Sequence, residues 1–293
     1  MTRSPSGAWT HAALLVTMLL YGGSFVAMKA AVNVLDPWLI VLARMLLAVA
    51  AFSVFLGRFP PVAHVGRHLP KLLAMALSEP CLYFVFEAKA LTLTQASQAG
   101  TITALLPVMV ACSAGFFLGE RTSPKAWAGL VLGLAGAVTL SAASAPQPYS
   151  PDPILGNTLE FAAMVCATAY TLLVRHLARH FPALFLTAFQ VAVGAVFFSP
   201  ALVFSPWPGT VTWQALAAVA FLGLGVSVGA YGLYNHCLSR LPAPRVAQAV
   251  NLIPAVSLLM GWAFLGETVQ GLQWAGVGLI GLGAVIGARA GTG

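Results

Sequence analysis

Residues 119–142 read GERTSPKAWAGLVLGLAGAVTLSA, and residues 266–289 read GETVQGLQWAGVGLIGLGAVIGAR. Each stretch opens on a Gly-Glu pair and continues into a glycine-rich apolar run. Crossing the ~30 Å hydrocarbon core of a bilayer takes ~20 apolar residues, so each run is long enough to span a membrane. The two stretches align at a constant offset, which indicates an internal repeat.

The repeat extends towards the N-terminal side of both stretches. Residues 97–141 align with residues 244–288, and roughly 13 of the 45 pairs are identical. The identical pairs include Pro107 with Pro254. We therefore divide the chain into two related halves, residues 1–146 and residues 147–293.

The composition excludes several classes of protein. Hydrophobic residues make up 59% of the 293 positions and charged residues only 7%, whereas a soluble domain has about 25% charged residues. Disorder requires the opposite balance, with few apolar residues and many charges. A nucleic-acid binder is also excluded, because the 14 basic residues are scattered with no basic run. The composition predicts an all-helical integral membrane protein.

The apolar runs predict ten transmembrane helices, five in each half. Ten helices of ~21 residues leave roughly 80 positions for loops and tails, so no loop can hold a soluble domain. The predicted segments are 10–32, 38–56, 70–91, 97–118, 125–142, 154–174, 183–204, 212–238, 246–265 and 272–288.

The basic residues predict the orientation of the chain. With a cytoplasmic N-terminus, the outward loops contain no Lys or Arg, which is the positive-inside pattern, and both termini are cytoplasmic. Since each half has an odd number of spans, the second half is inverted relative to the first. Secondary transporters use this plan, with a substrate site between the halves. The inward ends carry Arg3, Arg58, Arg67, Lys71, Arg121, Lys125, Arg175, Arg179, Arg240, Arg245 and Arg289.

Residues 21–30 read YGGSFVAMKA and are followed by Pro37 and Arg44. With this pattern the sequence resembles the ten-helix EamA branch of the drug/metabolite transporter superfamily, although many members have Trp where Tyr21 stands. The paired mid-helix prolines and Gly-Glu motifs also resemble the family. The resemblance implies export of amino acids or other small metabolites. One branch of the family, called YddG, exports aromatic amino acids.

The third predicted span has acidic and aromatic residues at intervals of four. Glu79, Tyr83 and Glu87 share one face of a regular helix at 100° per residue. Charges are costly in hydrocarbon and normally face the protein interior. We interpret this face as the lining of a substrate cavity, with structural interhelical hydrogen bonds or ion pairs as the alternative.

Further charges fall in the outer half of the predicted bundle. They could clamp the ammonium and carboxylate of a substrate, or form a structural ion-pair network that closes the outer mouth. Three intramembrane cations balance three intramembrane acids, which favours zwitterionic substrates over phosphorylated ones. The outer-half residues are Lys29, Arg44, Glu87, Lys89 and Glu160.

Uncharged polar residues in the second half are also candidates for substrate binding. Tyr234 lies in the eighth span, and Gln248 and Asn251 share a face at the start of the ninth. Their alternative role is interhelical hydrogen bonding. Pro107 and Pro254 break helical hydrogen bonds at equivalent positions and are predicted either to gate the pathway or to form static kinks.

The remaining motifs do not indicate an enzyme. Residues 276–281 match the dinucleotide pattern G-x-G-x-x-G, but they lie inside an apolar span with no preceding strand. We expect no catalytic residue, no metal and no cofactor, and no nucleic-acid partner. The predicted partners are a small-molecule substrate and the bilayer, for a monomer or dimer in the cytoplasmic membrane of a bacterium.

Two functions fit these features. The first is a secondary transporter that exports amino acids, including aromatic ones, and related metabolites by alternating access through a central cavity. The second is a transporter of phosphorylated or nucleotide-linked metabolites of the same superfamily.

Overall fold

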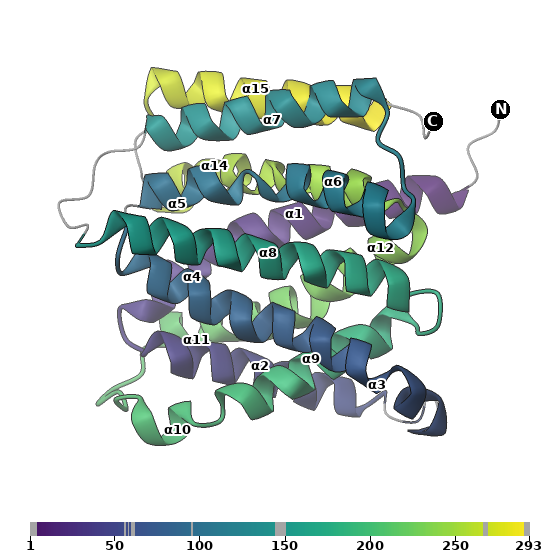
Figure 1. Ribbon diagram of the computed structural model, residues 1–293. Helices are drawn as coiled ribbons and strands as arrows, with labels where there is room; N and C mark the ends of the chain where they lie inside the picture. Colours follow the sequence, from purple (N-terminus) through teal and green to yellow (C-terminus); the bar gives the residue numbers. More distant parts are fainter. Residues whose placement is uncertain are drawn as a thin grey trace. The chain divides into compact units, whose positions relative to one another are not determined.

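The computed structural model describes residues 5–55, 57, 59, 62–94, 96–143, 151–265 and 269–289. Every regular element in this part of the chain is a helix (Figure 1). Among the described residues, nine helical stretches are long and apolar enough to cross a membrane, and a tenth, α2 (Pro37–Ser53), has 17 residues. The predicted all-helical membrane fold is therefore confirmed. Arg3, Arg58, Gly266 and Glu267 lie outside the described residues.

The outer surface is apolar to a degree that suits lipid rather than water. Phe116, Phe117 and Phe204 are 83%, 70% and 84% exposed. Large apolar side chains exposed to this degree suit contact with lipid. Of the charged residues in the spans, Arg44 and Glu160 are buried, at 5% and 1% exposure, whereas Lys29 and Lys89 are exposed.

The helices form two compact units. Unit 1 consists of Met1–Cys81 and Leu173–Arg240, and unit 2 of Leu82–Leu172 and Leu241–Gly293. Each unit therefore combines segments from both halves of the sequence. The long helix α8 (Pro153–Leu177) belongs to unit 2 except for its last turn.

Unit 1 is built around the packing of its first two helices on the eighth span. Ala31 and Ile40 are fully buried against Leu222 and Val226. Besides α2, its helices are α1 (Pro5–Val32), α3 (Val62–Ala76), the wider π-helical turns η2 (Leu77–Leu82) and η3 (Phe221–Ala230), α9 (Ala183–Phe198), α10 (Ala201–Phe204), α11 (Trp213–Ala220) and α12 (Tyr231–Arg240).

The third span differs from its prediction in two ways. It begins at Val62 rather than near residue 70, because its first turns are amphipathic rather than uniformly apolar. It is also interrupted at Glu79, whose backbone is extended (φ −147°, ψ 124°). Pro80 follows, and a proline disfavours the helical conformation of the residue before it. The prediction that Glu79 continues the helical face of Tyr83 and Glu87 is therefore wrong.

Unit 2 contains the two helices in which the sequence repeat is clearest. α7 (Pro124–Ala142) and α15 (Gly271–Arg289) lie side by side along their length (Figure 1). The other helices of this unit are α4 (Tyr83–Leu91), α5 (Ala96–Thr103), α6 (Leu106–Leu118), α13 (Ala243–Val250) and α14 (Leu252–Leu265).

Glycines bring the backbones of α7 and α15 into contact. A Cβ atom on Gly129 would lie 2.7 Å from the carbonyl oxygen of Gly283, and one on Gly136 would lie 2.7 Å from that of Gly276. In the sequence repeat, Gly129 corresponds to Gly276 and Gly136 corresponds to Gly283. Interchanging the two halves therefore turns each of these contacts into the other. The helices are thus antiparallel and meet around a local two-fold axis across their length. This is the geometry expected of an inverted repeat.

Both repeated prolines stand just after a break in their helix. α5 ends at Thr103 and α13 at Val250, each four residues before its proline, Pro107 or Pro254. Proline lacks a backbone N–H and clashes with the carbonyl four residues earlier, which explains both breaks. Whether the breaks act as gates stays a prediction.

Candidate functional site

In unit 1, three tyrosines and a glutamate form one cluster. The Tyr231 hydroxyl donates a 2.8 Å hydrogen bond to Oε1 of Glu79. The ring of Tyr21 packs edge-on against Tyr231 and Tyr234, with centroids 5.6 and 6.2 Å away. Tyr231 and Tyr234 are buried. Glu79 and Tyr234 are both site residues predicted from the sequence, but the contacts that join them through Tyr231 and Tyr21 were not predicted.

The two basic candidates of unit 1 have different environments. Arg44 is buried, and its Nε donates a 2.9 Å hydrogen bond to Oγ of Ser227. Ser227 lies in η3, so this bond joins the second and eighth spans. Lys29 is exposed in the last turn of α1. The structure thus ties Arg44 into the helix packing of unit 1, whereas Lys29 is at its surface.

A second polar network in unit 1 is centred on Asn235 of α12. Nδ2 of Asn235 donates hydrogen bonds of 3.0 Å to Oγ1 of Thr187 and 3.1 Å to Oε1 of Gln190. All three side chains are fully buried. Thr187 and Gln190 are polar residues in the otherwise apolar sequence of α9, and this pattern indicates an interior polar contact.

In unit 2, an acidic site lies between α4, α5 and α8. Oγ1 of Thr103 donates a 2.8 Å hydrogen bond to Oε1 of Glu160. Oε2 of Glu160 is buried and has no hydrogen-bond partner among the described residues. The Glu87 carboxylate is close enough to act on Glu160 electrostatically, and it accepts a 2.7 Å hydrogen bond from Tyr83. A buried carboxylate oxygen without a donor costs free energy, so this site suits a cationic ligand group.

Gln248 and Asn251 are engaged in helix packing within unit 2. Nε2 of Gln248 donates a 3.2 Å hydrogen bond to the carbonyl oxygen of Gly283. The side chain of Asn251 lies against Gly133, where a Cβ atom would be 2.5 Å from its Nδ2. Both side chains are buried. These contacts match the interhelical role considered as their alternative.

The ten predicted site residues fall in both units. Unit 1 contains Lys29, Arg44, Glu79 and Tyr234, and unit 2 contains Tyr83, Pro107, Glu160, Gln248, Asn251 and Pro254.

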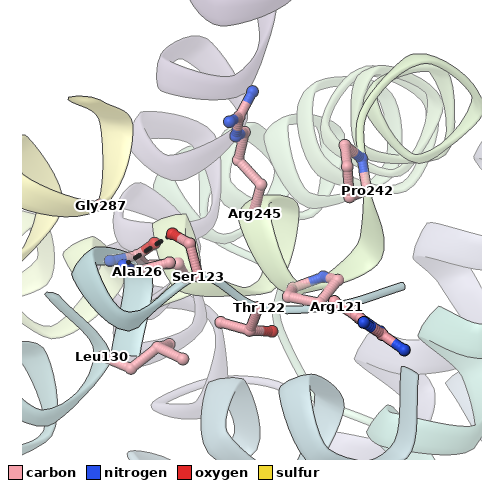
Figure 2. Close-up of a pocket in the computed structure, with 10 residues that line it drawn as sticks. Arg121, Thr122, Ser123, Ala126, Leu130, Pro242, Arg245 and Gly287 are labelled. Atoms are coloured by element: carbon pink, nitrogen blue, oxygen red, sulfur yellow. Dashed lines mark hydrogen bonds between the residues drawn. The ribbon is translucent and has the colours of Figure 1, made fainter. Parts of the chain in front are cut away.

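A small cavity of about 40 Å³ lies at one end of unit 2 (Figure 2). It is lined by the loop before α7, the first turn of α13 and Gly287 of α15. Ser123 caps α7 by accepting a 3.3 Å hydrogen bond from the backbone N–H of Ala126, as Figure 2 shows. Nearby, Glu120 accepts a 2.7 Å bond from the N–H of Ala243. The cavity holds only a few water molecules at most, so it is too small for an amino acid.

No cluster of three or more His, Cys, Asp or Glu side chains with the geometry of a metal site occurs in the described part of the chain.

In unit 1 a shallow, open hollow of about 470 Å³ is lined by Asn33, Val34 and the residues before α11. Neither hollow gathers the predicted site residues of its unit, apart from Gln248 at the small cavity.

The sequence profile of the EamA-like transporter family matches residues 8–142 and again residues 154–288. The chain belongs to the EamA-like transporter family. The double match agrees with the antiparallel contact of α7 and α15, since each copy of the profile covers five of the ten helices. The chain is accordingly a transporter and not an enzyme.

Several relatives of this EamA-like chain have transporter names. A protein of Archaeoglobus fulgidus named an uncharacterized transporter is 29% identical over 88% of this chain and 90% of its own length. The probable terminal-alkyne amino-acid exporter of Streptantibioticus cattleyicolor is 24% identical over 94% and 91%. The aromatic amino acid exporter YddG of Ancylobacter novellus is 30% identical over 50% of this chain and 51% of that protein.

A solved crystal structure supports the same fold for the EamA-like chain. It superposes with a TM-score of 0.81 over 95% of this chain and 96% of the other, at 23% identity. At this identity the likeness concerns the fold alone.

Proposed function

We propose that this EamA-like transporter exports amino acids, including aromatic ones, and related small metabolites across the bacterial cytoplasmic membrane by alternating access. Two relatives that carry amino-acid exporter names support this substrate class. The observation that carries the proposal is the Oε2 atom of Glu160, which has no hydrogen-bond partner in the described part of the chain and belongs to a residue that is 1% exposed.

The chemistry of Glu160 favours a substrate with an ammonium group. An ammonium donates up to three hydrogen bonds and neutralises the charge of the carboxylate it binds. Thr103 bonds to Oε1, and no described residue bonds to Oε2, so a ligand can donate to this atom. The nearby Glu87 adds negative potential to the same site. A phosphorylated substrate would be repelled by this pair of acids.

The tyrosines of unit 1 suit an apolar or aromatic side chain. Tyr21 packs edge-on against two neighbouring rings, an arrangement that another aromatic group can extend. Such contacts depend on shape and area rather than on a particular polar pattern. They are consistent with a transporter of broad specificity for the side chain.

The Glu160→Gln variant tests the proposal in proteoliposomes. We expect saturable uptake of labelled phenylalanine by the wild type and a KM about 10- to 100-fold higher in the variant, because a hydrogen bond to a charged group contributes about 1.5–3 kcal/mol. Phenylpropionate, which lacks the ammonium, should be a poor substrate of both proteins.

Asp152→Asn is the matched control. It removes one negative charge from the start of the same helix, α8, where Asp152 accepts a hydrogen bond from the N–H of Leu155. Asparagine caps helices as well as aspartate does, so uptake should be unchanged. If Glu160→Gln lowered the uptake of phenylalanine and of phenylpropionate by the same factor, an ammonium-binding role for Glu160 would be contradicted. Uptake of nucleotide sugars alone would favour the phosphorylated-metabolite transporter.

A further inference from the structure

Basic side chains from two separate segments of unit 1 meet at one place. They come from the first turns of α3 and from the end of α8 with the turn after it. Nζ of Lys71 donates a 2.9 Å hydrogen bond to Nε2 of His176. The rings of His68 and His180 stack with centroids 4.5 Å apart. We call this group the basic patch; it consists of Arg67, His68, Lys71, His176, Arg179 and His180.

Unit 1 has few acidic residues to balance the basic patch. Among its described residues only Asp36 and Glu79 are acidic. Asp36 caps α2 by accepting a 3.0 Å hydrogen bond from the N–H of Trp38. Glu79 accepts the hydrogen bond of Tyr231. The charged groups that act on His176 are all basic, namely Lys71, His180, Arg179 and His68.

The positive charges of Arg67, Lys71 and Arg179 repel one another, so the patch gains from an external anion. Arg67, Lys71 and Arg179 are exposed and can reach such an anion. Arg175 is not counted with them, because its guanidinium donates a 2.8 Å hydrogen bond to the carbonyl oxygen of Leu238.

The position of the patch along the spans indicates what kind of anion it meets. The membrane-spanning part of the third span begins at Val65, and that of α8 ends at Leu177. The patch therefore lies where two spans end, at the depth of the lipid headgroups. On α3, Leu69 and Leu73 are 40% and 38% exposed one turn apart, on the face of the helix opposite Lys71. The phosphate headgroups of anionic lipids are the anions found at this depth.

We propose that the basic patch is a binding site for the phosphate headgroup of an anionic phospholipid. Lys71 and Arg179 contact the phosphate, one from α3 and the other from the turn after α8. A bound anion lowers the repulsion between α3 and the end of α8 and so holds these segments of unit 1 together. The site is independent of the transported substrate.

The test uses the delipidated full chain in a neutral detergent. Dioleoylphosphatidylglycerol, dioleoylphosphatidylcholine and inorganic phosphate are titrated separately, and bound lipid is counted by native mass spectrometry. We expect the wild type to retain phosphatidylglycerol in preference to phosphatidylcholine and to show no comparable binding of phosphate. The double variant Lys71→Gln/Arg179→Gln should lose roughly 30-fold in affinity for phosphatidylglycerol, since each basic residue near an anionic surface contributes a factor of about five.

The control variant removes the same pair of residue types elsewhere. Arg121→Gln/Lys125→Gln takes one exposed Arg and one exposed Lys from unit 2 and should keep the wild-type affinity. Lys71→Arg/Arg179→Lys retains both charges and should bind within a few-fold of the wild type, which separates loss of charge from misfolding. Equal binding of both lipids, equal losses in both glutamine variants, or phosphate binding as tight as that of the lipid would overturn the proposal.

Discussion

Single polar residues inside the spans of this protein have specific hydrogen-bond partners. Asn235 bonds to Thr187 and Gln190, and Arg44 bonds to Ser227. Water is absent from the hydrocarbon core, so an unpaired polar group there costs several kcal/mol. The polar residues therefore determine which faces of the helices pack against each other.

Ser227→Ala tests the bond between the second and eighth spans. The substitution removes the acceptor of Arg44 Nε and leaves a buried charge with one bond fewer. We expect a loss of about 1–2 kcal/mol in the free energy of unfolding, measured as a lower apparent melting temperature in detergent.

Ser24→Ala is the control for Ser227→Ala. Among the described residues, the Ser24 hydroxyl bonds to a carbonyl of its own helix, that of Tyr21. Ser227 makes a comparable bond to the carbonyl of Leu222 in addition to its bond with Arg44. The difference between the variants thus isolates the interhelical bond. Equal melting temperatures would show that Ser227 adds nothing to the placement of Arg44.

At the scale of elements, glycines decide how closely two spans approach. Gly129, Gly136, Gly276 and Gly283 let α7 and α15 pack backbone against backbone. Small residues serve this purpose in membranes because the hydrophobic effect does not drive one apolar helix against another there. The glycines of the opening sequence stretch are thus a packing surface rather than a nucleotide-binding loop.

Gly283→Ala should destabilise the protein by about 1–3 kcal/mol, because its new methyl group would meet backbone atoms of both Gly129 and Gly133 at 2.7 Å. A thermal-stability assay in detergent measures the loss.

Gly281→Ala is the internal control, two residues away on the same helix. A Cβ atom at Gly281 meets nothing within 4 Å, so this variant should be neutral. Similar destabilisation by both variants would mean that helix flexibility, and not close packing, is what these glycines provide.

At the scale of the whole molecule, the distribution of basic residues predicts orientation. With cytoplasmic termini, α7 and α13 begin on the inner side, beside Arg121, Lys125 and Arg245. A green fluorescent protein fused after Gly293 should therefore fluoresce, and alkaline phosphatase fused there should be inactive. Alkaline phosphatase fused after Asp152, in a predicted outward loop, should be active. The reverse pattern would show that the chain is inserted the other way.

Composition and repetition in the sequence determined the class of protein and the number of spans. Both are local properties: a segment crosses a membrane because its own ~20 residues are apolar, whatever it packs against. The same holds for the helix breaks before Pro107 and Pro254, since a proline acts on the carbonyl four residues earlier in its own helix. The break at Glu79 could have been read from the adjacent Pro80, but the regular spacing of Glu79, Tyr83 and Glu87 suggested a continuous helix instead.

Only the tertiary structure decided which partner each polar residue has. Glu160 meets Thr103, Gln248 meets Gly283, and Lys71 meets His176 across separations of 57, 35 and 105 residues. A hydropathy pattern shows that such a side chain must face the interior, but it does not show which helices lie close to one another. For this reason the sequence identified Glu160 as a candidate, whereas only the packed helices showed that Thr103 bonds to one of its oxygens and that the other has no partner among the described residues.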